Sequence, residues 1–178
     1  MPDRRSELAD AALAVVAAKG LKGLTHRAVD AQAGVAVGTT SNYFRNRAAL
    51  MGAAVDRVEE RDRLLLQQGG TDIPTSVADL ADQIAGAVMG LAHQNAELTR
   101  ARFAFALDQP GVVTAGHERL VSALAQLLDA MGISEARSRA EAISDYSDGL
   151  ALHLLTARTG QDIDTAIVAR NILRLLEG

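Results

Sequence analysis

The sequence predicts an all-α protein with about nine helices. Apolar residues recur at spacings of three and four along most of the 178 residues, which is the period of helices that pack on one side. Gly, Pro and Ser-Thr-Asp clusters separate these stretches, and no segment alternates apolar and polar residues for long enough to form a strand. A hydrophobic content of 48% is sufficient for a buried core in one or two domains.

The first predicted helix covers about residues 4–19. Its apolar side comprises Leu8, Ala12, Val15 and Val16, which share one face at helical spacing. Gly20 and Gly23 follow, and we expect them to end the helix.

Residues 25–50, THRAVDAQAGVAVGTTSNYFRNRAAL, predict two short helices joined by a glycine turn. Thr25 caps the first helix, and Gly34 permits the left-handed conformation that a β-carbon would penalise. The second helix, at about residues 37–44, buries Phe44 and carries a polar series: Thr39, Thr40, Ser41, Asn42 and Tyr43. Hydroxyl and amide groups suit base edges and phosphates, so the layout indicates a DNA-binding helix-turn-helix. Such a turn followed by a Ser/Thr-rich helix also occurs in proteins that never touch DNA, which is the competing interpretation.

The remaining helices are predicted at about residues 47–68, 76–93, 96–107, 112–131, 134–159 and 163–176. The charge run at residues 56–63 is expected to form a solvated helix face. Apolar stripes in two of these helices predict mutual packing. One stripe comprises Leu80, Ile84, Val88 and Leu91, and the other comprises Leu120, Leu124, Leu127 and Leu128.

Composition excludes several classes of function. Cysteine is absent, so disulfides, thiolate metal sites and cysteine nucleophiles are excluded. The four histidines form no pair at the i, i+4 spacing of a helical metal site, and no phosphate loop or nucleophile elbow is present. We therefore predict no enzyme activity, no catalytic residue, no metal and no cofactor. No apolar run approaches the ~20 residues of a membrane helix, which favours a cytoplasmic protein without a membrane partner.

Charge is distributed unevenly along the chain. The net charge is −4, yet residues 1–47 hold seven Lys or Arg against four acids, and residues 48–178 hold eleven against eighteen. The asymmetry predicts that the amino-terminal end meets phosphate while the remainder repels nucleic acid.

Several motif residues resemble the pattern of the TetR family of bacterial transcriptional regulators. These residues are Ala33-Gly34-Val35, Gly38-Thr39, Tyr43-Phe44 and Arg47, with Ala49-Leu50 opening the next helix. The specific match covers the amino-terminal third; the rest is similar in length, in helical character and in a helix containing residues 148–150. Asp30 departs from the pattern, which usually has a small residue there. The resemblance implies a helix-turn-helix DNA-binding domain at residues 1–48 and a helical effector-binding and dimerisation domain at 49–178.

The resemblance also implies which residues contact DNA. The residues expected to contact base edges are Thr39, Thr40, Ser41 and Asn42. The residues expected to contact the DNA backbone are Thr25, His26, Arg27, Tyr43 and Arg47. Two recognition helices about 34 to 36 Å apart fit successive major grooves, so the expected partner is a palindromic operator in double-stranded DNA. The expected function is that of a homodimeric repressor.

The last helix predicts a dimer interface. Its apolar residues cover about half of the helical wheel, which is wider than the ~100° stripe of a helix packed on one side. A second burial partner is therefore expected, and a two-fold contact with another subunit would provide it. We place the interface at Ile143, Leu150, Leu154, Val168, Ile172, Leu175 and Leu176.

The resemblance finally implies a cavity for a small-molecule effector among the fourth to eighth helices, whose occupancy releases the protein from DNA. Polar or aromatic side chains on otherwise apolar helices are the candidates: Met89, His93, Arg102, Phe103, Phe105, Asp108, Tyr146 and His153. Arg102 would pair with Asp108 or with an acidic effector. Core packing or exposure is the competing interpretation for each candidate, and the aromatic content of 3% argues against a large aromatic cage. The alternative function is a ligandless dimeric DNA-binding or protein-interaction module.

Overall fold

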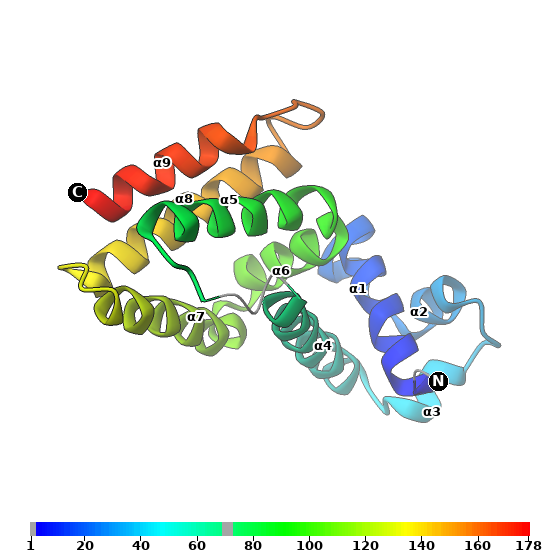
Figure 1. The fold of residues 1–178 in the computed structure, drawn as a ribbon. Coiled ribbons are helices and arrows are strands. Elements are labelled where there is room, and N and C mark those ends of the chain that lie inside the picture. The colour runs from blue at the N-terminus through cyan, green and yellow to red at the C-terminus, as the bar shows by residue number, and fades with distance from the viewer. Residues whose placement is uncertain (1–2, 69–72) are drawn as a thin grey trace. The chain divides into compact units, whose positions relative to one another are not determined.

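The computed structural model describes residues 3–68 and 73–178. Within those ranges it contains nine helices and no strand, which confirms the predicted all-α fold (Figure 1). The chain divides into two compact units, of which unit 1 comprises Met1–Leu65 and Glu97–Val113, and unit 2 comprises Leu66–Ala96 and Thr114–Gly178. None of the described helices combines the length and apolar character needed to cross a lipid bilayer.

Unit 1 contains the predicted helix-turn-helix. Its helices are α1 (Arg4–Gly23), α2 (His26–Ala33), α3 (Thr39–Tyr43), most of α4 (Arg47–Gln68) and α6 (Ala96–Asp108). The apolar side of α1 is buried as expected, but the helix continues to Gly23 because Gly20 absorbs a kink at a φ of +65°. Phe44 and Phe105 are the largest fully buried side chains of the unit 1 core, and the removal of such side chains from water stabilises a fold by roughly 1.5–3 kcal/mol each.

Ion pairs join α4 to two other helices of unit 1, α1 and α6. The Arg57 guanidinium on α4 binds both carboxylate oxygens of Asp10 on α1, at 2.8 and 2.7 Å. Arg102 on α6 pairs with Asp62 on α4, and burial raises the pKa of the Asp62 carboxyl despite that positive neighbour. The position of α4 therefore depends on α1 and on α6 together.

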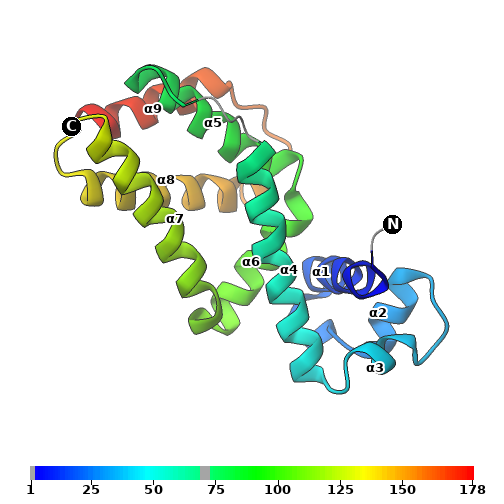
Figure 2. The ribbon, with the colours of Figure 1, turned by 60° about the horizontal axis from the view of Figure 1, so that its bottom comes forward.

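Unit 2 is a helical bundle of α5 (Val77–His93), most of α7 (Pro110–Ala130), α8 (Ala136–Leu155) and α9 (Thr165–Glu177). The α5 helix begins at Val77 because the Ser76 side chain accepts a hydrogen bond from the Asp79 N–H. It packs against both α8 and α9, and the two ribbon views show it alongside α9 (Figures 1 and 2). The apolar sides of α5, α7, α8 and α9 form one core.

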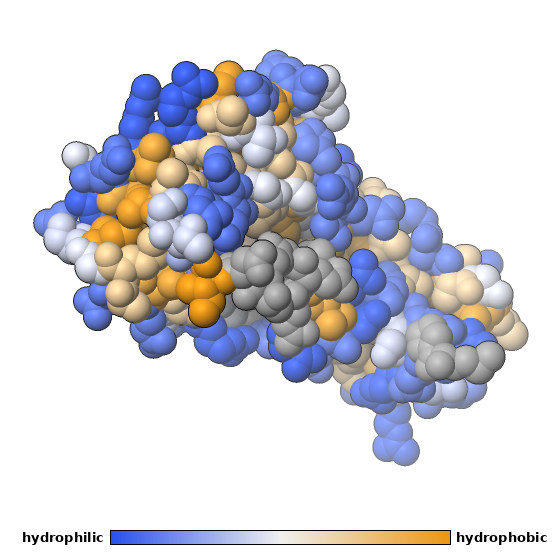
Figure 3. Space-filling view, in the orientation of Figure 1, coloured by the Kyte–Doolittle hydropathy of each residue, from blue (hydrophilic) through white to orange (hydrophobic). Residues whose placement is uncertain are grey.

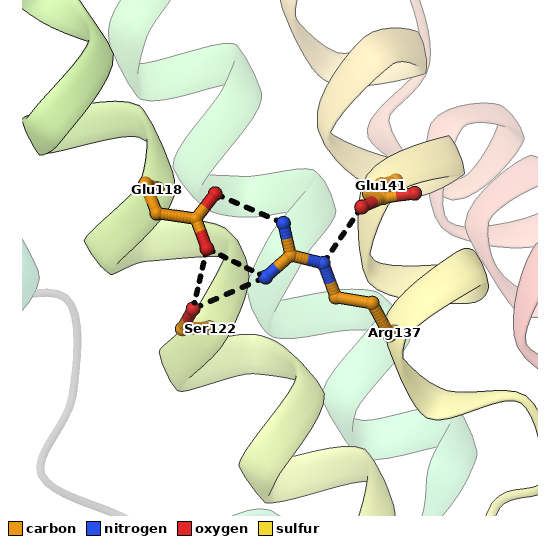
Figure 4. A network of polar contacts seen from close by, with 4 residues as sticks. All are labelled: Glu118, Ser122, Arg137 and Glu141. Atoms are coloured by element: carbon orange, nitrogen blue, oxygen red, sulfur yellow. Dashed lines mark hydrogen bonds and ion pairs between the residues drawn. The ribbon is translucent and has the colours of Figure 1, made fainter.

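An exposed polar network joins α7 to α8 (Figure 4). The Arg137 guanidinium on α8 donates to both carboxylate oxygens of Glu118 on α7, at 2.8 and 2.9 Å, and its Nε donates to Glu141. Hydrogen bonding by Arg137 and Ser122 lowers the pKa of Glu118 to about 2 from the ordinary 4.5. A lowered pKa in the folded state means that this link is complete above pH 4.5 and weakens as the pH falls toward 2.

Candidate nucleic-acid interface

Two glycines in the left-handed region shape the turn between α2 and α3. Gly34, with a φ of +65°, ends α2, and Gly38, with a φ of +94°, precedes α3. No heavy atom lies within 4 Å of a β-carbon placed on Gly34, so glycine is required there by backbone conformation and not by lack of space. The Val35 N–H then donates to the Asp30 carbonyl oxygen at 3.0 Å, which closes the turn.

A buried carboxylate holds this turn against α3. The Asp30 residue is 1% exposed, and its Oδ2 accepts a hydrogen bond from the Gly38 N–H at 2.7 Å. Its Oδ1 accepts from the Thr40 N–H at 2.7 Å and from the Thr40 hydroxyl at 2.6 Å. These backbone N–H groups lie at the start of α3, where a helix has no internal acceptors for them. Asp30 on α2 thus caps α3 across the turn, which explains why this position holds an acid.

The hydrogen bonds keep the Asp30 carboxyl ionised. Burial by itself would raise its pKa, but the hydrogen bonds from Thr40 and Gly38 outweigh burial and lower the pKa below the ordinary 3.8. Because the pKa is lowered in the folded state, the stabilisation is present above pH 3.8 and is lost only as the pH falls through the lowered value. The cap is therefore fully formed near neutral pH.

Side chains from α1 and α2 also bind the carboxyl-terminal end of α3. His26 Nε2 donates to the Phe44 carbonyl oxygen at 2.7 Å, and the Arg5 guanidinium donates to the Tyr43 carbonyl oxygen at 3.5 Å. Arg5 also lies over the Phe44 ring, 4.8 Å from its centroid, in a cation–π contact. A helix of five residues cannot hold its own shape in water, so these external contacts give α3 a fixed position.

The solvent-facing side of the turn and α3 forms a surface that we call the recognition surface. It comprises Val37, Thr39, Ser41, Asn42 and Tyr43, all exposed or half-buried. The Thr39 hydroxyl donates to the Ala36 carbonyl oxygen at 2.6 Å, and the Ser41 hydroxyl donates to the Gly38 carbonyl oxygen at 2.7 Å. Both hydroxyls retain lone pairs, so they can accept from base amino groups.

The structure corrects the predicted base contact of Thr40. Its side chain is 0% exposed and its hydroxyl is bonded to Asp30, so it faces the protein interior and not the recognition surface. The sequence placed it among the base-contacting residues because consecutive Ser and Thr look alike in a short polar helix. Its role is to hold α3 in place.

The predicted backbone-contact residues divide into two groups. Thr25 and Arg27 are exposed; the Thr25 hydroxyl caps α2 by accepting from the Ala28 N–H at 3.1 Å. His26 is half-buried and bonded to Phe44, and the Arg47 guanidinium donates to the Leu21 carbonyl oxygen at 2.5 Å. Arg27 therefore presents its charge to solvent most directly, whereas Arg47 also joins α4 to the end of α1.

Three further residues belong to this interface and were not predicted to contribute. Asp30 positions α3, Arg45 is exposed directly after α3, and Val37 is an exposed apolar residue beside it. The departure of Asp30 from the family pattern was the one sequence signal that pointed to any of them.

Comparison with known proteins decides the assignment of this domain. Residues 8–54 match the model of the family described as "Bacterial regulatory proteins, tetR family". The amino-terminal segment is therefore similar to the DNA-binding domain of TetR-family regulators. Among curated proteins, no sequence matches the chain.

Solved structures show that the whole chain has the fold of TetR-family transcriptional regulators. A TetR-family member from Streptomyces coelicolor A3 is 28% identical, with a TM-score of 0.72, over 98% of this chain and 99% of that chain. The multidrug binding protein EbrR complexed with malachite green is 26% identical, with a TM-score of 0.73, over 98% of this chain and 99% of that chain. A transcriptional regulator from Rhodococcus sp. Rha1, at 20% identity and a TM-score of 0.80 over 98% of this chain and 95% of that chain, shares the fold.

The predicted effector residues of this chain lie in both units. In unit 1, Arg102 pairs with Asp62 and not with Asp108, Phe105 is a core residue, Phe103 is half-buried, and Asp108 lines an open cleft beside Lys19 and Lys22. In unit 2, the Tyr146 hydroxyl accepts from Asn171 at 3.0 Å, and His153 is exposed. The pairing of Arg102 with Asp108 was therefore wrong, because an α4 carboxylate already neutralises the guanidinium.

Met89 and His93 are brought together in unit 2. They line a cleft of about 470 Å³ that is open to solvent. The other lining residues are Gly86, Gly90, Gln94, Asp162, Ile163 and Thr165. The side chains of Met89 and Ile163 lie there beside amide, hydroxyl, imidazole and carboxylate groups, so the lining is more polar than that of a typical small-molecule site.

The predicted interface residues require a second correction. Ile143, Leu150, Leu154, Val168, Ile172 and Leu176 lie in the unit 2 core of a single chain, and Leu175 packs against that core. The second burial partner of α9 is found within its own unit, because both α5 and α8 contact it. All of these side chains except Leu175, which is partly buried, are consequently covered before any second subunit is present.

Proposed function

We propose that this chain is a cytoplasmic, homodimeric repressor that binds a palindromic operator in double-stranded DNA and is released by a small-molecule effector. The recognition surface is the observation that carries this proposal. It lies on a helix fixed at both ends, and its side chains face solvent, as entry into a major groove requires. The excess of basic residues in the first 47 residues suits a phosphate backbone.

Dimerisation would use the outward sides of α8 and α9. Leu152 on α8 is 40% exposed and Ile167 on α9 is 48% exposed, although each is a large apolar residue. Figure 3 shows apolar residues interspersed with hydrophilic ones on the visible surface of unit 2. A two-fold contact would bury this surface and would present two recognition surfaces to one duplex.

DNA binding is tested by selecting bound duplexes from a random pool and then measuring two variants on the selected sequence. Asn42→Ala is expected to lower affinity for the selected site about tenfold while affinity for a scrambled site stays unchanged, because a base-edge contact is worth about 1–3 kcal/mol. Arg27→Ala is expected to weaken binding to both duplexes equally and to reduce the salt slope by about one. Equal losses on both duplexes for Asn42→Ala would remove its role in sequence selection, and a pool without enrichment would reject the function.

The effector would bind the unit 2 cleft that contains Met89 and His93. The crystallised complexes of the similar protein EbrR hold ethidium and malachite green, so these dyes are the first probes to use. A β-carbon on Gly86 meets no atom within 4 Å, so Gly86→Leu fills the cleft without straining α5.

We expect dye to lower the operator affinity of the native chain and Gly86→Leu to weaken dye binding at least tenfold, as measured by calorimetry. Gly52→Leu on α4 is the matched control, because its β-carbon also meets no atom within 4 Å and Gly52 is exposed. Dye that binds both variants equally would place the effector elsewhere. If no tested compound changes DNA affinity, the alternative of a ligandless dimeric DNA-binding module is favoured.

A further inference from the structure

Val37 is a large apolar side chain in a place where solvent-facing residues are polar. It is 82% exposed and lies directly before Gly38 and α3, among the hydroxyl and amide groups of the recognition surface. Valine gains nothing from contact with water, since it has no hydrogen-bonding group in its side chain. Single exposed apolar residues are common on protein surfaces, so what distinguishes Val37 is its place directly beside the polar side chains of α3.

The backbone of the turn fixes this exposure. Val35, two residues earlier, packs against the unit 1 core, whereas Val37 does not. The next residue, the left-handed Gly38, is held by the hydrogen bond from its N–H to Asp30, which fixes the backbone directly after Val37. The exposed valine is thus a permanent feature of the surface beside α3.

The neighbouring polar groups limit what this surface can recognise by hydrogen bonding. The hydroxyl hydrogens of Thr39 and Ser41 are committed to the carbonyl oxygens of Ala36 and Gly38. Beside Val37 these two hydroxyl oxygens remain as acceptors, with the exposed Asn42 amide as the nearby donor group. In the major groove the apolar feature of a base pair is the 5-methyl group of thymine.

We propose that Val37 determines specificity by contacting the 5-methyl group of a thymine in the major groove. The inference rests on the proposed function and adds one base preference to it. The contact discriminates thymine from cytosine through the methyl group alone, at a position next to the base pairs that Asn42 reaches.

Uracil substitution in the selected operator tests the contact, because uracil differs from thymine only by that methyl group. Each thymine of one half-site is replaced in turn, and affinities are measured for the native chain, for Val37→Ala and for Leu107→Ala. Leu107 is the matched control, since it is an 85% exposed apolar residue on α6 of the same unit. All three proteins are checked for equal melting temperature first.

We expect one thymine position at which uracil weakens binding by the native chain and by Leu107→Ala about fourfold, which corresponds to ~0.8 kcal/mol for one buried methyl-sized group. Val37→Ala should bind the thymine and uracil operators equally. Uracil that is tolerated at every position, or a uracil effect that persists in Val37→Ala, would overturn the inference while leaving DNA binding intact. A pool that yields no bound sequence would overturn both the inference and the proposed function.

Discussion

Replacement of Asp30 by alanine is expected to destabilise unit 1 by at least about 3 kcal/mol, because three donors near the start of α3 lose their acceptor and each buried unpaired donor costs about 1–3 kcal/mol. The loss should be visible in urea denaturation and in faster amide exchange at Gly38 and Thr40. DNA affinity should fall at least tenfold at denaturant concentrations where the variant is still folded, since α3 loses the cap at its first turn.

Two further variants isolate the role of the carboxylate. Asp56→Ala removes an exposed carboxylate from α4 and should change stability by less than about 0.5 kcal/mol. Asp30→Asn retains the shape of the side chain but supplies one acceptor oxygen in place of two, so its stability should fall between those of the native chain and Asp30→Ala. If Asp30→Ala proves as stable as Asp56→Ala, the cap contributes nothing and another contact must hold α3.

Ile172→Asp is expected to unfold unit 2 and not to dissociate a folded dimer. Ile172 is 0% exposed within one chain, and a carboxylate at that place has no positive partner in the core cluster. An unpaired buried charge belongs to the class of substitutions that cost more than about 4 kcal/mol. Circular dichroism and urea denaturation should show lost helix and a transition shifted to lower urea.

Ile167→Asp on the same helix provides the contrast, since the same chemical change falls on a side chain that is 48% exposed. The variant should keep its helix content and melting behaviour, while analytical ultracentrifugation shows a dimer dissociation constant at least tenfold higher. An unchanged constant would move the interface away from the outward side of α9. A folded, monomeric Ile172→Asp protein would instead return Ile172 to the interface and would contradict the core assignment.

The sequence was sufficient to predict helix ends where the boundary carries a local signal. Thr25 caps α2 and Gly34 ends it, as predicted, whereas Ser76, predicted as the first residue of its helix, is instead the cap of α5. The kink at Gly20 was missed because a glycine near a helix end predicts termination, and a second short helical segment after it has no local signature.

The candidate site was less predictable because its residues depend on contacts between helices. The helical spacing of apolar residues predicts that Ile172 is buried. It does not distinguish burial against α5 from burial against another subunit. The same limit applies to Thr40 and Arg102, whose partners Asp30 and Asp62 lie 10 and 40 residues away in the chain. A one-dimensional pattern identifies a side chain's chemistry, and only the packed structure identifies its partner.

Because Asp30 caps α3, the residues that fix the position of this helix differ from the residues that it exposes on the recognition surface. The helix is held by the side chains of Arg5, His26, Asp30 and Thr40 and by backbone atoms, so positions 37, 41 and 42 can be exchanged without loss of those contacts. A combinatorial library at these three positions should therefore yield mostly folded proteins, from which variants with new operator preferences can be selected. The domain is in this respect a ready scaffold for engineering orthogonal gene switches.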